Sequence, residues 1–282
     1  MLTGSTRAAG VIGSPIRHSL SPAIFNAAFG AAGLDWAYLA FEVPDGAARL
    51  AMAGMRALGL EGLSVTMPHK AAVIDGLDGL SDDAAALGAV NCITNRGGVL
   101  HGDNTDGAGF IDALRVDEGI EVHGARCAIV GAGGAGRAVA RALGQAGAAS
   151  IAVINRTPAP AQRAVGLAGP RARIGGADDV RSADLVVNAT PLGMGVVVST
   201  AGEPEPMPLD VSQLGSDQVV IDLVYHPPVT PLLAEARRQG LRTVNGLGML
   251  IHQAAHAFRL WTNEEPPLEA MSAAAVAGLS VR

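Results

Sequence analysis

A glycine-rich turn at residues 131–136 constrains the fold more than any other feature. It follows the β-branched run Cys127–Val130 and precedes a helical stretch at 136–146 and a second β-branched run at Ile151–Ile154. This order predicts a βαβ unit that binds a dinucleotide. The first glycine makes the tight turn, the second admits a pyrophosphate, and the third lets the helix pack on the strand. The alternative is a turn without a ligand, since 37 of the 282 residues are glycine.

Short apolar runs alternate with Ala- and Leu-rich helical stretches along the chain. This alternation predicts an α/β fold with parallel sheets covered on both faces. Further strands are expected at 9–13, 36–43, 62–66, 185–188 and 219–223, with a hairpin at 91–103 around Gly97-Gly98. Further helices are expected at 22–32, 46–59, 70–75, 82–87, 107–116, 249–260 and 268–279. Residues 196–208 are expected to form a mobile loop, and we find no internal repeat.

Charge and cysteine content exclude several classes of protein. With 20 basic and 26 acidic residues the formal charge is −6, which argues against a nucleic-acid binder and against attachment to an anionic membrane. We expect no signal peptide and no membrane span, because no apolar run approaches ~18–20 residues. Cys92 and Cys127 cannot form a disulfide framework. The expectation is therefore a reduced, cytoplasmic protein.

The end of the strand at 151–154 bears on the choice of cofactor. NAD enzymes place a carboxylate there to accept a hydrogen bond from the ribose 2′-hydroxyl. This chain has Asn155-Arg156-Thr157 instead. A guanidinium and two hydrogen-bonding neighbours can hold a 2′-phosphate. The residues therefore favour NADP over NAD, the alternative being a solvated arginine.

Two serines stand at the start of the first expected helix. Ser19 and Ser21 are spaced by two, so they can face the same side of an extended segment. Together with the free N–H groups of the helix end they suit a carboxylate ligand. Ser21 alone is also explained as the N-cap of a helix that has Pro22 at its first position. Ser19 has no such explanation.

Polar residues also follow the expected strand at 62–66. Lys70 stands at a strand-to-helix junction and can line a cleft, although a surface position is the common fate of a lysine. Asn91 follows Gly88-Ala-Val, and Asp103 and Asp106 bracket an Asn-Thr turn. Either aspartate could simply form the turn. Spacing alone does not show that Lys70 and Asp106 meet.

Two other patterns indicate no chemistry. His252 and His256 are four residues apart on a helix, as in a zinc site, but Gln253 stands where a metalloprotease needs glutamate. We therefore expect no metal. Cys92 and Cys127 have no histidine or acid at a signature spacing and are expected to be buried.

Taken together, the motifs resemble the shikimate dehydrogenase (shikimate/quinate dehydrogenase) family nearly end to end. In family order they are Val11–Pro22, Val65–Lys70, Gly88–Asn91, Gly102–Gly107, Gly131–Gly136, Asn155–Thr157, Asn188–Met194, Asp222–Tyr225 and Gly246–Gln253. The resemblance implies reversible reduction of 3-dehydroshikimate to shikimate by NADPH, in the biosynthesis of chorismate and aromatic amino acids.

The resemblance also implies two α/β domains with a cleft between them. A catalytic, substrate-binding domain would cover 1–106 and be completed by helices in 247–282, and a Rossmann-type NADP-binding domain would cover 107–246. The partner is then a small-molecule substrate, with no nucleic acid and no membrane, for a monomer or homodimer.

Family roles carry over to matching positions. Lys70 and Asp106 would be the catalytic pair. Substrate would be bound by Ser19, Ser21, Thr66, Asn91, Tyr225 and Gln253. Cofactor would be lined by Gly131, Ala132, Gly133, Gly134, Ala135, Asn155, Arg156, Thr157, Leu223, Gly246 and Asp82.

Two positions depart from the family pattern. Ser64 stands where the family usually has asparagine, so one substrate contact would be shorter or mediated by water. Pro160 stands where the family often has a second phosphate-binding arginine, and the nearest basic residue is Arg163. Alternatives are a dehydrogenase acting on quinate or an amino-substituted relative, with broader cofactor use. Others are an NADP-binding sensor without catalysis and a folate-type dehydrogenase, which the paired serines disfavour.

Overall fold

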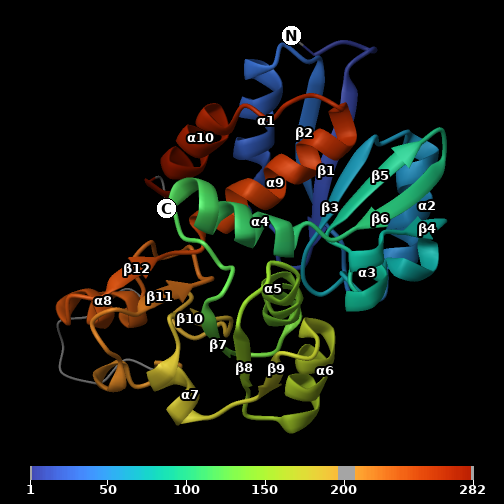
Figure 1. The fold of residues 1–282 in the computed structure, drawn as a ribbon. Coiled ribbons are helices and arrows are strands. Elements are labelled where there is room, and N and C mark those ends of the chain that lie inside the picture. Colours follow the sequence, from blue (N-terminus) through green and yellow to red (C-terminus); the bar gives the residue numbers. More distant parts are fainter. Residues whose placement is uncertain (1, 196–206, 281–282) are drawn as a thin grey trace. The chain divides into compact units, whose positions relative to one another are not determined.

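The computed structural model describes residues 2–195 and 207–280, which form two compact units (Figure 1). Unit 1 comprises Met1–Thr105 and Ile251–Arg282, and unit 2 comprises Asp106–Leu250. Each unit has its own sheet. The loop expected at 196–208 lies almost entirely outside the described residues.

Unit 1 is built on a mixed sheet. Within its described residues the strand order is β2-β1-β3-β5-β6-β4. Their bounds are β1 Arg7–Gly13, β2 Trp36–Glu42, β3 Gly62–Val65, β4 Gly79–Leu80, β5 Cys92–Arg96 and β6 Val99–Asp103. β5 runs antiparallel to both β3 and β6, so this sheet is mixed. The β5–β6 pair is the hairpin expected at 91–103, and its tight turn at Gly97 and Gly98, with φ of 60° and 92°, joins antiparallel strands.

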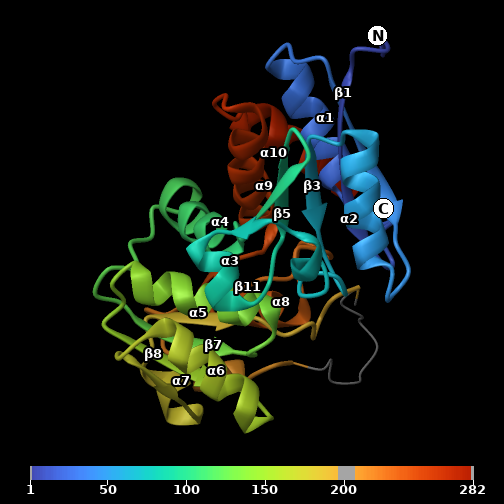
Figure 2. The same ribbon diagram turned by 90° about the vertical axis from the view of Figure 1, so that its right-hand side faces the viewer.

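Helices cover both faces of this sheet (Figures 1 and 2). α2 (Ala48–Leu58), the 3₁₀ turn η1 (Ile74–Gly76) and α3 (Asp82–Leu87) pack on one face, and α1 (Ser21–Ala31), α9 (Leu247–Thr262) and α10 (Leu268–Ser280) lie on the other. Trp261 of α9 lies against Gly62 of β3, where an added Cβ would be 2.4 Å from the indole. The indole nitrogen donates to the carbonyl of Ile93, at 3.0 Å. A glycine in β3 therefore lets a large aromatic ring rest directly on the sheet.

Two expected helices differ from the structure. Residues 70–75 form turns ending in η1 rather than an α-helix. The carbonyl of Lys70 accepts from the backbone N–H of Val90, at 2.7 Å, and so is used outside a helical ladder. The helix expected at 107–116 begins one residue earlier, as α4 (Asp106–Asp112), and continues as the π-helical turn η2 (Ala113–Asp117).

Unit 2 contains the expected parallel sheet. Within its described residues the strand order is β12-β11-β10-β7-β8-β9, with every neighbouring pair parallel. The strands are β7 Arg126–Val130, β8 Ser150–Ile154, β9 Ala172–Ile174, β10 Leu185–Asn188, β11 Val219–Asp222 and β12 Arg242–Val244. α4, α5 (Gly134–Gln145) and α6 (Pro158–Ala168) pack on one face, and α7 (Ala177–Ser182), η3 (Val211–Gln213) and α8 (Pro231–Arg238) on the other. This is a doubly wound, Rossmann-type sheet.

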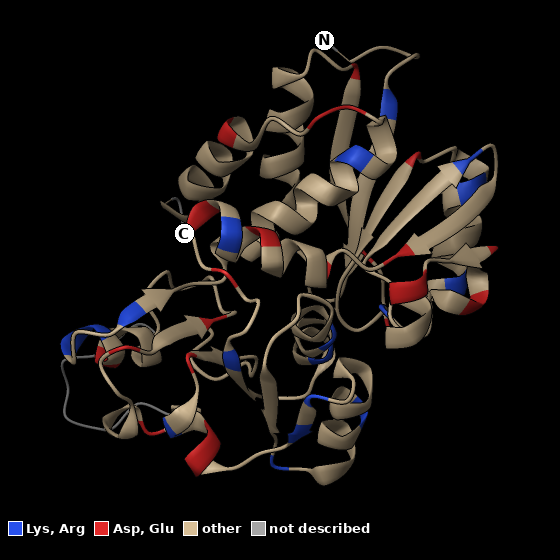
Figure 3. Ribbon diagram, in the orientation of Figure 1, with Lys and Arg blue, Asp and Glu red and all other residues tan. Residues whose placement is uncertain are grey.

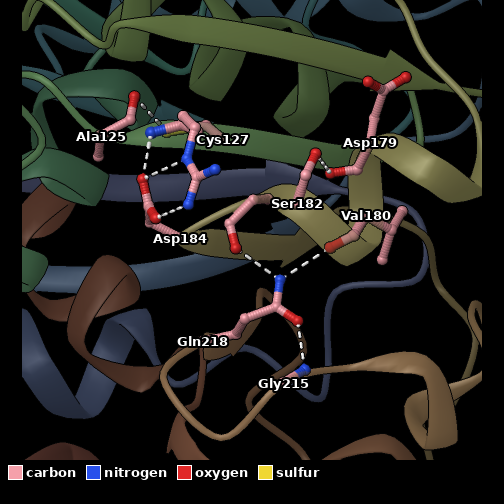
Figure 4. Close-up of polar contacts among 10 residues, drawn as sticks. Ala125, Cys127, Asp179, Val180, Ser182, Asp184, Gly215 and Gln218 are labelled. Atoms are coloured by element: carbon pink, nitrogen blue, oxygen red, sulfur yellow. Dashed lines mark hydrogen bonds and ion pairs between the residues drawn. The ribbon is translucent and has the colours of Figure 1, made fainter.

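Polar contacts close the amino-terminal edge of this sheet (Figure 4). The Asp184 carboxylate accepts from the backbone N–H of Arg126 at 2.8 Å and from its guanidinium at 2.6 Å. These bonds lower the pKa of Asp184. Gln218 donates to the carbonyl of Val180 at 2.8 Å and accepts from the N–H of Gly215 at 2.8 Å. The ends of the loops at this edge are thus held by structural bonds, and a ligand is expected at the opposite, carboxyl edge.

Charged residues of both signs are interleaved in each unit (Figure 3). Several form surface ion pairs, such as Arg56 with Asp78 at 2.7 Å and Arg259 with Glu265 at 2.7 Å. Among the described residues, no helix combines the length and the apolar character needed to cross a bilayer.

Candidate active site

Hydrogen bonds fix the segment that follows β3 at His69 and at the backbone carbonyl of Lys70. His69 is fully buried, and its Nε2 donates to the carbonyl of Val43 at 2.7 Å. The carbonyl of Lys70 accepts from Val90, as described above. Lys70 is half-buried and is the only lysine among the 282 residues. The main chain that carries this ammonium is therefore held firmly.

Asn91 links that segment to two other predicted residues. The carboxamide accepts from the N–H of Thr105 at 2.8 Å and donates to the Thr105 hydroxyl at 3.0 Å. That hydroxyl donates in turn to the carbonyl of Gln253 at 3.1 Å. Val90 precedes Asn91, and Thr105 precedes Asp106. These hydrogen bonds therefore link the chain segments that carry four predicted site residues, namely Lys70, Asn91, Asp106 and Gln253.

The structure gives Ser19 a local hydrogen bond and gives Ser21 no capping role. α1 begins at Ser21 itself, Leu20 is the N-cap, and no side chain caps the helix. The capping role expected of Ser21 is wrong, because Ser21 lies inside the first turn and a capping residue precedes it. Instead the Ser19 hydroxyl accepts from the backbone N–H of Ser21, at 3.2 Å. Ser21, buried and not used as a cap, is the serine whose role local structure leaves unexplained.

Thr66 lies one residue past β3, and Ser64 lies within it. The phenol of Tyr38 on β2 donates to the Ser64 hydroxyl at 2.7 Å. Sequence reasoning missed Tyr38, whose place in an apolar strand indicates only a core residue.

In unit 2 the glycines of the turn divide into two kinds. Gly131 has φ of 106°, and a Cβ there would lie 2.8 Å from the backbone of Ala189. A Cβ on Gly136 would lie 2.2 Å from the carbonyl oxygen of Gly131. The fold therefore requires both glycines. Gly133 and Gly134 are exposed, and an added Cβ would meet nothing within 4 Å. This open space lies at the start of α5, whose first N–H groups no side chain caps, and it fits the phosphates of a dinucleotide.

The residues after β8 combine bracing and exposed charge. The Asn155 carboxamide accepts from the N–H of Ala132 at 3.1 Å and donates to the carbonyl of Thr157 at 2.8 Å. Asn155 therefore holds the glycine turn. Arg156 next to it is exposed, as is Arg163 on α6. The exposed Arg156 guanidinium at this strand end suits a phosphate.

A buried polar cluster joins the carboxyl ends of β10 and β11. Asp222 accepts from the amide of Asn188 at 2.9 Å, from the N–H of Val224 at 3.0 Å and from the hydroxyl of Thr230 at 2.6 Å. Burial raises the pKa of Asp222. Sequence reasoning did not assign this cluster, although an Asn and an Asp that end adjacent apolar strands were a signal for it.

The bond from the Val224 N–H to Asp222 fixes the main chain between Leu223 and Tyr225. A Cβ on Gly246 would lie 2.0 Å from the carbonyl oxygen of Leu223. Gly246 therefore lets two loops at the carboxyl edge touch.

Asp82 lies at the protein surface, whereas the two cysteines are buried. Asp82 belongs to unit 1 and is exposed in the first turn of α3. Cys92 and Cys127 are free and buried, as predicted, and burial raises the pKa of Cys127 to about 12. In residues 2–195 and 207–280 no three His, Cys, Asp or Glu side chains gather in a group that could hold a metal.

Comparison with known families covers most of the chain. The model of the shikimate dehydrogenase substrate binding domain matches residues 11–93. That of shikimate / quinate 5-dehydrogenase matches 114–247, and that of the shikimate 5′-dehydrogenase C-terminal domain matches 246–276. The chain belongs to the shikimate dehydrogenase family. The resemblance inferred from its motifs is confirmed.

Individual members of the shikimate dehydrogenase family are similar over their whole length. The shikimate dehydrogenase (NADP(+)) of Methanopyrus kandleri is 45% identical, over 94% of this chain and 93% of its own. The Thermus thermophilus enzyme, solved with NADP(H) and shikimate, is 38% identical with a TM-score of 0.88, covering 97% of this chain and 100% of its own. Quinate dehydrogenase from Corynebacterium glutamicum, solved with NAD, is 33% identical with a TM-score of 0.86, covering 96% of this chain and 99% of its own.

Proposed function

We propose that this chain is an NADP-dependent shikimate dehydrogenase, which reversibly reduces 3-dehydroshikimate to shikimate. The observation that carries the proposal is Lys70. It is the only lysine in a chain whose other basic residues are all arginine or histidine, and it occupies the family's lysine position. Arginine stays protonated at any physiological pH, whereas a lysine ammonium can give up its proton. A lysine rather than an arginine at this place favours proton transfer.

Lys70 and Asp106 form the proposed catalytic pair. NADPH supplies a hydride to the carbonyl carbon when it is bound. The carbonyl oxygen then gains negative charge and needs a proton as that charge forms. The Lys70 ammonium donates this proton in reduction and takes it back in oxidation. Ionised Asp106 orients the ammonium.

The remaining residues bind and orient the substrate. Ser19 and Ser21 hold its carboxylate at the start of α1. Side chains from several elements surround the other polar groups of the substrate, namely Thr66, Asn91, Gln253 and Tyr225. The bonds that Thr105 makes with the Asn91 side chain and with the Gln253 carbonyl support this role, because they reduce the freedom of both segments before substrate arrives.

The cofactor is assigned mainly to unit 2. Its diphosphate lies on the turn Gly131–Ala135, where Gly133 and Gly134 leave open space. Arg156 and Thr157 hold the 2′-phosphate, and Asn155 holds the glycine turn in place. Arg163 on α6 is a second basic residue proposed to face this phosphate. Leu223 and Gly246 contribute from the carboxyl edge, and Asp82 from unit 1.

We further propose that residues 1–106 with 247–282 act as the substrate domain and 107–246 as the NADP domain. The enzyme works in the cytoplasm as a monomer or a homodimer. The two buried free thiols support a reducing compartment.

Initial rates with shikimate and with quinate, each against NADP and NAD, test the proposal. Appearance of the reduced cofactor is followed by absorbance. We expect the highest kcat/KM for shikimate with NADP. A higher value for quinate would replace the substrate assignment, and binding of NADP without turnover of either acid would make the chain a sensor rather than an enzyme.

A further inference from the structure

Tyr38 is a buried polar side chain that the proposed mechanism does not use. Only 1% of the residue is exposed. Its ring stacks on Phe25, with centroids 4.4 Å apart and planes at 9°, and lies 6.0 Å from the ring of Trp261. Its backbone N–H and carbonyl both bond to the Asn26 side chain, at 2.9 Å each. Ring and main chain are therefore both held, so the phenol oxygen has a well-defined position.

The phenol reaches over β1 to a residue of β3. β1 lies between β2 and β3, and its residue beside Tyr38 is Ala9, whose small side chain leaves room for the ring. The hydroxyl donates to Ser64 Oγ at 2.7 Å. A phenol has one proton to donate. Once that proton is directed at Ser64, the proton of Ser64 itself is left for another acceptor.

Ser64 lies close in the sequence to a residue that is proposed to bind substrate. Ser64 is half-buried and stands two residues before Thr66, where the family usually has asparagine. Burial raises the pKa of Tyr38, and hydrogen bonding to Ser64 acts in the opposite direction. An asparagine amide carries donors whose directions its own plane defines, but a serine hydroxyl rotates freely. A serine at this position needs a partner to direct its proton.

We propose that Tyr38 is a positioning residue for substrate specificity, which directs the Ser64 hydroxyl as a donor to a ring hydroxyl of a cyclic polyhydroxy carboxylate. The inference rests on the proposed function and extends it. Tyr38 does not touch the substrate. It acts through Ser64 alone.

The first test is Tyr38→Phe, which keeps the ring stack and removes only the hydroxyl. The KM for shikimate should rise about tenfold, the scale of one hydrogen bond. The kcat and the KM for NADP should stay unchanged, because the phenol contacts neither cofactor nor reacting atoms. Thr262→Val is the matched control. It removes a hydroxyl bond of 2.8 Å to the Phe258 carbonyl in the same unit, and it should lower Tm without changing KM.

The second test is the isosteric pair Ser64→Thr and Ser64→Val. Threonine keeps the donor and should keep KM near the wild-type value, whereas valine should raise it. Tyr38→Phe combined with Ser64→Val should raise KM no further than Ser64→Val does, since both act through one hydroxyl. If Tyr38→Phe does not fold, an unchanged KM in Ser64→Val still overturns the inference, because Tyr38 acts only through Ser64.

Three results would overturn the inference. They are an unchanged KM in Tyr38→Phe, effects of Tyr38→Phe and Ser64→Val that multiply, and an unchanged KM in Ser64→Val. Failure of the proposed function is separate, because then the wild-type chain would not oxidise shikimate with either nicotinamide cofactor.

Discussion

Asn91 and Thr105 hold each other through two hydrogen bonds, one at 2.8 Å to the Thr105 N–H and one at 3.0 Å to its hydroxyl. The pair connects the start of β5 to the residue before Asp106. Thr105→Val keeps the shape of the side chain and removes the hydroxyl from both Asn91 and Gln253. We expect a KM for shikimate raised about tenfold and a stability loss of ~1–3 kcal/mol, since buried partners lose their bonds. Steady-state kinetics and urea unfolding measure both. An unchanged KM would mean that this bond does not help to position Asn91 and Gln253.

Lys70→Ala should lower kcat by ~10²–10⁴, the scale of a positioned acid–base group. The dissociation constant for NADP should not change. Lys70→Arg keeps the charge but cannot deliver a proton at neutral pH, so it should be nearly as slow. Single-turnover rates with bound substrate measure the step. Turnover of Lys70→Arg at the wild-type rate would contradict proton transfer by this residue.

Gly133→Ala and Gly136→Ala separate the two kinds of glycine. Gly133→Ala should fold normally, because its Cβ meets nothing within 4 Å, but it should weaken NADP binding by intruding on the phosphate. Gly136→Ala should be markedly unstable, because its Cβ would lie 2.2 Å from the Gly131 carbonyl oxygen. Thermal unfolding and titration with NADP measure the two effects. Equal NADP affinity in Gly133→Ala and wild type would refute this phosphate site.

Arg156→Gln should reduce kcat/KM for NADP by about ten- to a hundredfold and leave the value for NAD unchanged, as expected for loss of a charge-assisted bond to the 2′-phosphate. Arg163→Gln is the comparison variant on α6 and should have a smaller effect. Initial rates with each cofactor at saturating shikimate provide the measurement. Equal losses with both cofactors would show that Arg156 does not recognise the phosphate.

Asp184→Asn should lower stability at pH 7 by about 1 kcal/mol or less, since both partners are half exposed and water screens the pair. Hydrogen bonds from Arg126 lower the pKa of the folded carboxyl below its ordinary 3.8. The pair therefore stabilises the fold above pH 3.8 and loses its effect as the pH falls through the folded pKa. The Tm difference from wild type should shrink below that pH. Asp217→Asn is an exposed control, and a difference that persists unchanged in acid would count against the pair.

Local patterns predicted the single elements well. The helix expected at 82–87 and the strand expected at 185–188 have the same bounds in the structure. The hairpin around Gly97-Gly98 is also confirmed. Capping residues, glycines and apolar periodicity act over a few residues, and their effect is visible in the sequence.

Contacts between distant residues were less predictable. Ser21 does not cap α1, because the helix begins at Ser21 itself and Leu20 is the N-cap. Residues 70–75 do not form a helix because Val90 takes the carbonyl of Lys70. Tyr38 and Ser64 are 26 residues apart, and nothing along the chain indicates that β1 lies between their strands.

The sequence by itself determined the family, the glycine turn and the identity of the chemical groups, since each depends on residue types at short spacing. Only the tertiary structure decided which hydroxyls and amides bond to one another, namely Asn91 to Thr105, Tyr38 to Ser64 and Asn188 to Asp222. A hydrogen bond requires its two atoms to approach within about 3 Å. For residues on different strands, the order and register of the sheet decide that distance.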